Sequence, residues 1–577
     1  MMQQTLGISD YKSRRSYIPK DFEITDWESL KPYVDFLLSQ EPASVEELEA
    51  FLYQVNELDA IVQEELAWRY IRMTCNTQDE SLVERYQYFI QEILPHISIF
   101  EDALNRKLVA NPYFDQLDPA RYQTYIRSVK KDIELFREEN IPLLTEDQTI
   151  AQQYSALTSV MSIEHEGKTL TFQQAGKLME SQDRQLRKAI WEKVWARRTQ
   201  DADKLEDIFD QLVAIRHQVG QNAGFDTYTA YKFLSRGRFD YSQEDTLAFH
   251  DAVEKAVRPV YEAIMQERKQ RLGLDELRPW DLNVGMFGDT PLRPFTGADE
   301  LVSKTISLLS ALRPELGEMI ALMDRMGYLD LESRVGKAPG GYNYPLMEVG
   351  VPFIFMNATG TQSDVTTMLH ESGHAIHAFL TLDIGLNVLK NTPSEVAELA
   401  AMSMELLSLD HYGIFYPDQA ERLRAQKEQL MRCLIILPWI ATVDAFQQWV
   451  YDHPHHSREQ RSHKWLELHR RFHGDVVNWE GYEPYKAGLW LKQGHIFDVP
   501  FYYIEYAIAQ LGAIAIWRNF RQDPQQGLEG YLNALRLGYT RPIPQIYETA
   551  HIRFDFSETY IRECMQFCLE AYHDLKV

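Results

Sequence analysis

Two histidines and a glutamate near residue 370 have the types and the spacing needed to hold and use a metal ion. His370 and His374 lie four residues apart, on one face of a predicted helix, so both rings can bind one ion. Glu371 would lie beside that ion without binding it. This HExxH arrangement is typical of zinc hydrolases, although two ordinary helix histidines are the alternative. Gly373 favours the metal site, because a glycine inside a helix is costly unless another segment packs closely there.

A catalytic zinc ion needs a third protein ligand, and the nearest candidate in the sequence is His377. Seven residues separate it from His370, which is about 10 Å along a helix axis, so the three rings cannot meet at one ion. We therefore expect His377 to contribute to helix packing or to support the ligands. The metzincin pattern requires a histidine at position 380, and Leu380 excludes that class.

The next predicted helix, over residues 392–405, offers three glutamates as the third ligand, and a proline and a serine mark its start. Glu395 lies in the first turn, where an acid often complements the helix dipole. Glu398 and Glu405 are seven residues apart and share one face, among small and apolar residues. The spacing favours Glu398 as the ligand and Glu405 as a group that orients a histidine or the chain.

Two elements are expected to position the metal-binding helix. Ser363 can cap its N-terminus and Asp364 complements the positive end of its dipole, so the helix should begin about two turns before the histidines. Residues 340–360 are typical of two short strands. The second strand, over residues 351–357, contains a proline, which suits an edge strand. Such a strand could bind a substrate peptide as an added strand, or it could only support the helix.

The rest of the sequence is typical of amphipathic helices. After the capping pair Ser44 and Glu47, apolar residues recur at three- and four-residue spacing. Similar patterns cover residues 80–140, 174–220, 241–273 and 297–328. The clearest hairpin signal lies at residues 163–172, around a Glu-Gly pair. We therefore predict a mainly α protein with a small β-hairpin or sheet region beside the HExxH helix.

The composition is that of an acidic, globular protein. The 577 residues are 45% apolar, and 59 basic against 85 acidic residues give a net charge of −26. This charge repels nucleic acids and anionic membranes, so neither is an expected partner. The longest apolar runs, such as residues 433–443, are too short for a bilayer and are broken by Pro438. The absence of a signal-peptide pattern and the four scattered cysteines favour a cytoplasmic location.

Six histidines in a late segment could be taken for a second metal site. They are His453, His455, His456, His463, His469 and His473. Their polar, arginine-containing surroundings are more typical of an exposed face, and that is the prediction.

Four motifs give the sequence a specific family resemblance. HESGHAIH is followed by SEVAELAAMSMELL and is preceded by GGYNYPL and PFIFMNATGTQSDVTTMLHE. Together these motifs resemble the M3 peptidases, in particular the oligoendopeptidase F-like branch of the thimet oligopeptidase clan. The resemblance is strong over about residues 335–410 and weaker at 280–282 and 494–513. Before about residue 190, only helical character and a general likeness in size remain.

The resemblance assigns roles to the central residues. In that family, two histidines and a glutamate on the next helix bind zinc. This implies one zinc ion per chain, held by His370, His374 and Glu398. The catalytic glutamate of the family corresponds to Glu371.

A late segment corresponds to the residues with which the family binds substrate and stabilises the tetrahedral oxyanion. The histidine corresponds to His495. The tyrosines fall in the YYIEY sequence, which is one residue longer than the YYGY of the mammalian members. We select Tyr502 and Tyr506, one helical turn apart, over Tyr503. Judged by spacing alone, the tyrosines would better fit an ordinary core face.

The resemblance implies a two-lobed helical metallopeptidase around a deep central channel that admits flexible peptides. Residues 1–190 would form a helical part of one lobe, and residues 191–577 the catalytic region. The implied activity is zinc-dependent hydrolysis of internal bonds in short oligopeptides, by a monomer or a small homo-oligomer. Two alternatives stay open: an exopeptidase with the same motif, and a scaffold or metal-binding module without turnover. The intact Glu371 argues against the second alternative.

Overall fold

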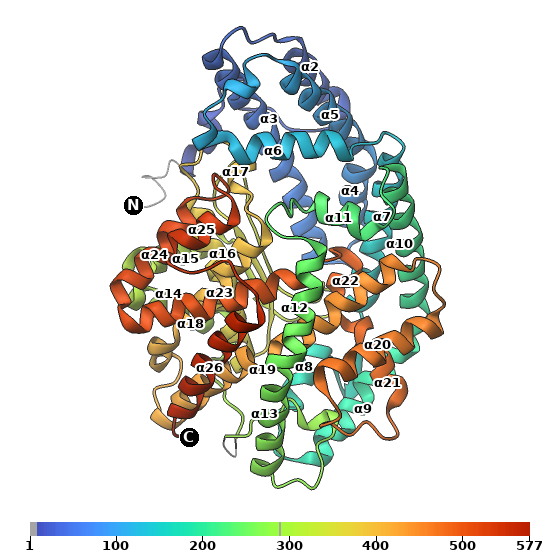
Figure 1. Ribbon diagram of the computed structural model, residues 1–577, viewed down its shortest axis with the longest axis vertical. Coiled ribbons are helices and arrows are strands. Elements are labelled where there is room, and N and C mark those ends of the chain that lie inside the picture. The colour runs from blue at the N-terminus through green and yellow to red at the C-terminus, as the bar shows by residue number, and fades with distance from the viewer. Residues whose placement is uncertain (1–7, 288–289) are drawn as a thin grey trace.

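The computed structural model describes residues 8–287 and 290–577, and it confirms a mainly helical, two-lobed fold. Figure 1 shows a group of N-terminal helices, in blue, above a larger body formed by later parts of the chain. The upper helices are α2 (Trp27–Ser39), α3 (Val45–Cys75), α5 (Leu94–Ala110) and α6 (Pro119–Leu135). They surround an apolar core of their own, which also receives Leu386 and Leu389 from far along the sequence. The helix α4 (Glu80–Tyr88) and a π-helical turn (Phe89–Ile93) join α3 to α5.

The larger body contains the other α-helices of the described chain and one extensive apolar core. Those before the HExxH motif are α7 (Asn140–Ser159), α8 (Phe172–Leu178), α9 (Arg184–Gln200), α10 (Ala202–Asn222), α11 (Tyr228–Ser235), α12 (Gln243–Ala256), α13 (Arg258–Arg271), α14 (Gly297–Leu312) and α15 (Pro314–Met326). The motif and the sequence after it form α16 (Gln362–Leu380), α17 (Asn387–Lys390), α18 (Ser394–Leu407), α19 (Gln419–Asp452), α20 (Arg458–His473), α21 (Glu483–Ala487), α22 (Gly494–Asp498), α23 (Tyr503–Gln522), α24 (Pro524–Arg536), α25 (Ile543–Thr549) and α26 (Glu558–Asp574).

Two small sheets accompany the helices. β1 (Ser162–His165) and β2 (Lys168–Thr171) form the predicted antiparallel hairpin, and Glu166 and Gly167 in its turn have positive φ angles of 51° and 73°. The second sheet contains β3 (Leu329–Glu332), β4 (Tyr342–Tyr344) and β5 (Phe353–Ala358). Its order is β3-β5-β4, with β5 parallel to β3 and antiparallel to β4.

The prediction that residues 351–357 form an edge strand is wrong. β5 is the central strand of its sheet, and β4 is the edge strand that lies beside α16. Pro352 lies just before β5 begins, so the N–H group that proline lacks is not needed for the ladder. The free backbone edge next to the HExxH helix therefore belongs to residues 342–344.

The N-cap of α16 also differs from the prediction, because Thr361 takes the place expected for Ser363. Thr361 has extended backbone angles, and its side chain accepts the N–H of Asp364 at 3.3 Å. Asp364 in turn accepts the N–H groups of residues 359, 360 and 361, each at 2.8 Å. Ser363 already lies in the first turn, where its backbone is helical and cannot form a cap. The start of the helix is thus fixed by a reciprocal capping box.

Close packing between α16 and α18 depends on Gly373. A Cβ atom at this position would lie 2.6 Å from both the Ala400 carbonyl oxygen and the Ala401 Cα. These backbone atoms cannot rotate away, so only glycine allows the two helices to approach this closely. The close packing inferred from a glycine within the helix is confirmed.

The helix α19 continues through Pro438, which was expected to break the apolar run. One turn after the proline, the Thr442 hydroxyl donates to the Pro438 carbonyl at 2.7 Å. Of the helices in the described ranges, α19 alone is long and apolar enough to cross a membrane, with a mean hydropathy of 1.4 over its most apolar window. Because 72% of that window is buried inside the protein, α19 equally fits the description of a core helix.

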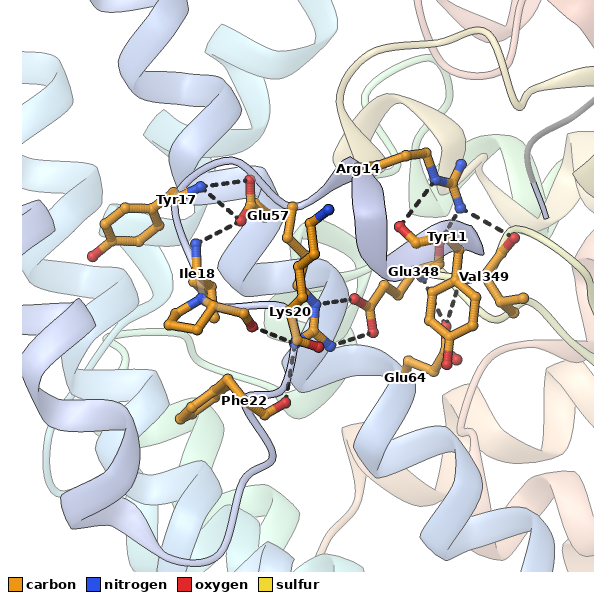
Figure 2. A network of polar contacts seen from close by, with 12 residues as sticks. Tyr11, Arg14, Tyr17, Ile18, Lys20, Phe22, Glu57, Glu64, Glu348 and Val349 are labelled. Atoms are coloured by element: carbon orange, nitrogen blue, oxygen red, sulfur yellow. Dashed lines mark hydrogen bonds and ion pairs between the residues drawn. The ribbon is translucent and has the colours of Figure 1, made fainter. Parts of the chain in front are cut away.

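The loop between β4 and β5 is held in place by the N-terminal region (Figure 2). Glu64 of α3 accepts the backbone N–H groups of Glu348 and Val349, both at 2.8 Å. Arg14 donates to the Glu348 carbonyl at 2.6 Å, and Arg15 donates to the Glu348 carboxylate at 2.9 Å. The first helices of the chain therefore fix a loop that belongs to the larger body.

Replacing Gly373 with alanine should destabilise the protein and weaken metal binding. The new methyl group would force α16 and α18 apart, and overpacking of this kind costs about 1–3 kcal/mol. We expect a lower midpoint of thermal unfolding and a lower zinc affinity in competition with a chelator. Gly176→Ala is the control, because nothing lies within 4 Å of its new methyl group. Equal midpoints for the two variants would contradict the packing role of Gly373.

Candidate metal centre and catalytic cavity

His370, His374 and Glu398 come together between α16 and α18. Their ligand atoms lie within 4.8 Å of one another, and the described residues contain no second group of this kind. His370 Nε2 lies 3.2 Å from Glu398 Oε2, and His374 Nε2 lies 3.8 Å from Glu398 Oε1. The centroids of the two imidazole rings are 5.0 Å apart, and the rings are nearly perpendicular. One helix thus carries two nitrogen atoms, and the other an oxygen atom, that could bind one ion.

Glu405 lies behind His370 and fixes the orientation of its ring. His370 Nδ1 is 2.7 Å from Glu405 Oε1. The other carboxylate oxygen of Glu405 accepts the Gln429 amide at 2.7 Å, and the Gln429 carbonyl oxygen accepts the Thr366 hydroxyl at 2.9 Å. With Nδ1 facing a carboxylate, Nε2 is directed at Glu398. Sequence spacing indicated Glu405, but nothing in the sequence marks Gln429, which comes from α19.

The three atoms fit a zinc ion. Two imidazole nitrogens and one carboxylate oxygen are a common donor set at catalytic zinc sites, and they leave a fourth position open. Glu398 Oε2 is buried and lacks an aligned hydrogen bond, although His370 Nε2 is close. Burial lowers the pKa of His370, but the Glu398 and Glu405 carboxylates outweigh this effect and raise it well above its ordinary value. The surroundings therefore stabilise a positive charge at this point, which zinc would supply.

His374 is in the neutral form, which is the form of histidine that can bind a metal ion. Burial lowers the pKa of His374 to about 4, so the ring carries no charge at neutral pH and keeps a lone pair for a metal. Burial raises the pKa of Glu398, but the nearby His374 and His370 outweigh this effect and hold that pKa below its ordinary value. The ligand carboxylate is therefore ionised.

Glu371 lies next to the cluster and is buried without a partner for one of its oxygens. In the part of the chain that the structure describes, Glu371 Oε2 makes no hydrogen bond. Burial raises the pKa of Glu371 to about 7, so this carboxylate binds a proton more strongly than an exposed glutamate does. Gly341 lies opposite, and a Cβ at that position would be 3.5 Å from Glu371 Oε1. A glycine here leaves room for a ligand beside the carboxylate.

The late residues His495, Tyr502 and Tyr506 reach the same site from α22 and the start of α23. Tyr502 donates its hydroxyl to Glu398 Oε1 at 2.5 Å. His495 Nε2 lies 3.1 Å from the Tyr506 hydroxyl, and His495 Nδ1 accepts the Gln493 amide at 2.8 Å. Because Nδ1 accepts, the proton of the neutral ring is on Nε2, facing Tyr506. Burial lowers the pKa of His495 to about 4, which keeps the ring neutral.

A buried ion-pair network supports Tyr502 from the side away from the metal site. Arg236 lies over the Tyr502 ring at 4.9 Å and pairs with Glu505 at 2.7 Å. Arg238 also pairs with Glu505, at 3.0 Å. Sequence analysis missed these three residues. The glutamate inside the YYIEY sequence was the available signal, because a charged residue on an otherwise apolar helix face needs a partner.

The remaining residues considered from the sequence lie outside the 4.8 Å group. His377 is buried one turn after His374, and burial together with the nearby His374 lowers its pKa to about 3. Glu395 is also buried, and it accepts the Tyr241 hydroxyl at 2.6 Å. Tyr503 does not line the cavity that holds the cluster, unlike Tyr502 and Tyr506.

The prediction of an exposed histidine face over residues 453–473 is wrong for two members. His469 and His473 are buried, and their rings stack with centroids 4.4 Å apart. They lie on the inner side of α20, beside Trp439 and Trp479, so apolar packing outweighs the polar character of the local sequence.

The cluster lies in a cavity of about 370 Å³, a size within the usual range for ligand sites. Its walls come from four parts of the chain: β4 and the loop after it, α16, the segment from α17 to α18, and the α22–α23 region. They include Gly341, Tyr342, Asn343, Leu346, Met347, Thr381, Leu382, Lys390, Asn391, Thr392 and Val499.

A larger cavity of about 760 Å³ lies under the N-terminal helices and contains none of the cluster residues. Asp498 and Pro500 line the larger cavity and Val499 lines the smaller one, so both cavities lie against the same segment.

Comparisons with known proteins identify the family. The sequence profile of Peptidase family M3 matches residues 177–566, and that of the Peptidase M3 N-terminal domain matches residues 19–136. Oligoendopeptidase F of Lactococcus lactis subsp. cremoris is 23% identical over 239 residues, and an oligoendopeptidase F homologue of Mycoplasma pneumoniae is 26% identical over 277 residues. These matches cover 41% and 45% of this chain, and only 38% and 41% of the two relatives.

Solved structures match over a longer span. PZ peptidase A, solved with an inhibitor, is 25% identical and aligns over 98% of this chain and 99% of its own chain, with a TM-score of 0.92. Oligoendopeptidase F from Enterococcus faecium is 16% identical and covers 100% of this chain and 98% of its own, with a TM-score of 0.61. The second likeness shows the fold alone.

Glu405→Gln should weaken zinc binding by about ten- to a hundred-fold, which is the usual effect of losing a group that orients a metal-binding histidine. The amide fills the same space but no longer attracts the Nδ1 proton as a carboxylate does. Competition with a chelator measures the affinity. Glu318→Gln on α15 is the matched control, because this exposed glutamate makes no polar contact with any residue in the described ranges. Wild-type affinity in Glu405→Gln would contradict the orienting role.

Proposed function

This chain belongs to peptidase family M3, and we propose that it is a zinc-dependent endopeptidase that hydrolyses internal bonds of short oligopeptides. The observation that carries the proposal is the position of Glu371, a buried carboxylate with a free oxygen beside the His370, His374 and Glu398 group. A protein that only stored or sensed zinc would have no chemical need for such a base.

We propose one zinc ion per chain, held by His370, His374 and Glu398. When bound, zinc supplies Lewis-acid chemistry, which lowers the pKa of water towards neutrality and polarises a peptide carbonyl. Tyr502 and Glu405 keep the ligand side chains in place, through Glu398 and His370 respectively. The ligands are therefore arranged before the metal binds, which reduces the cost of binding.

Glu371 is proposed as the general base and then the general acid. It takes a proton from the attacking water and passes that proton to the nitrogen of the leaving amine. Burial suits it to the first step, because a carboxylate that binds a proton more strongly than usual removes one from water more readily. The space beside Gly341 leaves room for the scissile bond.

Tyr506 and His495 are proposed to stabilise the charge that develops on the carbonyl oxygen. Both line the cavity. The Nε2 hydrogen of His495 faces the Tyr506 oxygen, which leaves the hydroxyl hydrogen of Tyr506 free to point into the cavity. A donor that is already fixed before the reaction stabilises the tetrahedral state more than the planar substrate, so it mainly raises the rate. Tyr502, whose hydroxyl donates to Glu398, is proposed to assist in stabilising this charge.

The backbone of the substrate is proposed to pair with β4. This strand is the edge of its sheet, and Gly341, Tyr342 and Asn343 line the cavity beside Glu371. An extended peptide added to an edge strand gains backbone hydrogen bonds that do not depend on its sequence. Asn343 Nδ2 is buried and has no partner in the described chain, so it can donate to such a peptide. A flexible peptide can enter this channel, whereas a folded protein cannot extend a strand into it.

Two further expectations remain proposals. A cytoplasmic location would suit a peptidase with free, mostly buried cysteines. The net charge of −26 argues against nucleic acid and anionic membranes as partners. An exopeptidase with the same centre is the second candidate, and the blocked termini of the substrates below distinguish it.

Zinc-loaded wild type should cut short peptides with both termini blocked, at internal bonds, and Glu371→Gln should bind zinc but cut none of them. Mass spectrometry identifies the products, and metal analysis confirms loading. Removing zinc with a chelator should stop wild-type cleavage, and added zinc should restore it. Cleavage restricted to unblocked peptides would indicate an exopeptidase, and no cleavage by zinc-loaded wild type would indicate a binding module.

Tyr506→Phe should lower kcat by about a hundred-fold or more, because it removes one donor to the developing oxyanion. KM should change much less, since the same donor contributes little to binding of the planar substrate. Tyr560→Phe on α26 is the matched control, because it removes another buried hydroxyl away from the cavity. A rise in KM with an unchanged kcat would show that Tyr506 binds substrate without stabilising the transition state.

A further inference from the structure

Lys390 lies in the wall of the cavity that holds the metal-site cluster, and it has no polar partner among the described residues. It ends α17 and lines the cavity together with Asn391 and Thr392. Within residues 8–287 and 290–577, no hydrogen bond, ion pair or aromatic ring contact engages its ammonium group. A lysine that is half-buried without a counter-charge is unfavourable unless a ligand supplies one.

The charges around Lys390 favour an anion at this point. Burial lowers the pKa of Lys390, the nearby Arg14 lowers it further, and only Asp383 acts in the opposite direction. Arg14 is engaged with the carbonyl oxygens of Glu348 and Val349, at 2.6 and 3.4 Å, and not with a carboxylate (Figure 2). Asp383 is exposed and forms no ion pair with Lys390. Arg14 therefore adds positive charge near Lys390, and no acid of the described residues forms an ion pair with this lysine.

The acids that line this cavity form no ion pair with Lys390. Glu398 faces the two metal-binding histidines, and Glu371 is beside them. Neither is paired with Lys390. Among the described residues no acid pairs with Lys390, so its ammonium group is available to a negative charge on a molecule that enters the cavity.

The backbone that carries Lys390 is held on both sides. The Leu389 carbonyl accepts the Tyr539 N–H at 2.7 Å, and the Asn387 N–H donates to Asn56 of α3 at 2.5 Å. Leu386 and Leu389 are buried in the core of the N-terminal lobe. The lysine is thus presented from a fixed point between the lobes, and a ligand need not order a loop in order to reach it.

We infer that Lys390 binds a carboxylate of the peptide substrate and so sets a charge preference of the cavity. This inference rests on the proposed peptidase function, since it assumes a peptide as the occupant. The carboxylate has two possible sources: the free C-terminus of the peptide, or the side chain of an aspartate or glutamate. An ammonium group recognises both by the same charge-assisted hydrogen bond. The role is specific to Lys390, because the nearby Arg14 is engaged with backbone carbonyls.

Binding of matched peptides tests the inference without requiring turnover. The protein is zinc-loaded Glu371→Gln, which should leave peptides intact, and calorimetry measures their affinity. The first pair is an N-acetylated neutral peptide with a free C-terminal acid and its C-terminal amide. The second pair is the amide peptide with a glutamate or a glutamine at each position in turn. Each pair is measured with Lys390 intact and with Lys390→Met, Lys390→Arg or Lys31→Met added.

With Lys390 intact, one carboxylate form should bind about tenfold more tightly than its neutral twin. The pair that shows the difference identifies the source of the carboxylate. Lys390→Met should remove the difference, and Lys390→Arg should retain most of it. Lys31→Met, an exposed lysine on α2, should retain all of it. The affinity of each variant for the neutral twin serves as its own test of a folded cavity.

An equal preference in Lys390→Met, or no preference in any pair with Lys390 intact, would overturn the inference. Turnover of the same peptides by wild type is measured separately. A preference that depends on Lys390, together with no cleavage by wild type, would reject the proposed activity and keep the carboxylate site. Cleavage by wild type without such a preference would reject the carboxylate site alone.

Discussion

The approach of α16 to α18 is the constraint on which the site depends. Two histidines on one helix and a glutamate on the next must bring their ligand atoms within 4.8 Å, which side chains cannot do across an ordinary helix spacing filled by large residues. Gly373 removes the side chain at the contact, and Ala400 and Ala401 face it from α18. α23 also packs against α18 and brings the late tyrosines to the same place. Small residues at one crossing therefore decide the geometry of the whole centre.

This arrangement places several carboxylates close together in a buried place. Glu371, Glu398 and Glu405 surround two histidines. Burial raises the pKa of Glu371, His370 lowers it, and the charges of Glu398 and Glu405 raise it again, so the net effect is that Glu371 ionises less readily. Mutual repulsion of this kind would be costly in an ordinary core, and a bound cation relieves it. The nearby Glu505 is handled differently, because Arg236 and Arg238 neutralise it. Within the described residues, no arginine or lysine pairs with Glu371, Glu398 or Glu405 next to the proposed metal position.

The two lobes contribute to one cavity in unequal ways. The larger body supplies the helices that carry the chemistry, whereas the N-terminal lobe holds the surrounding segments in place. Glu64 fixes the loop after β4, and Asn56 fixes α17, which carries Lys390. A change in the angle between the lobes would therefore move the walls of the cavity before it moved the ligands. This division suits a site that must keep a fixed metal geometry while it accepts peptides of different sequence.

Sequence alone was sufficient where the relevant interactions are local. The i, i+4 spacing of His370 and His374, the helical periodicity and the hairpin at residues 163–172 all depend on neighbours within one or two turns. The choice of Glu398 over Glu395 used only the face of one helix, together with a family resemblance. Tertiary structure alone decided which strand is the free edge, which residue caps α16, and that His469 and His473 are buried. It also supplied Gln429, Arg236 and Lys390, whose roles arise from contacts between segments far apart in the chain. Such contacts leave no local pattern, because packing of whole helices, and not the spacing of neighbouring residues, determines which side chains meet.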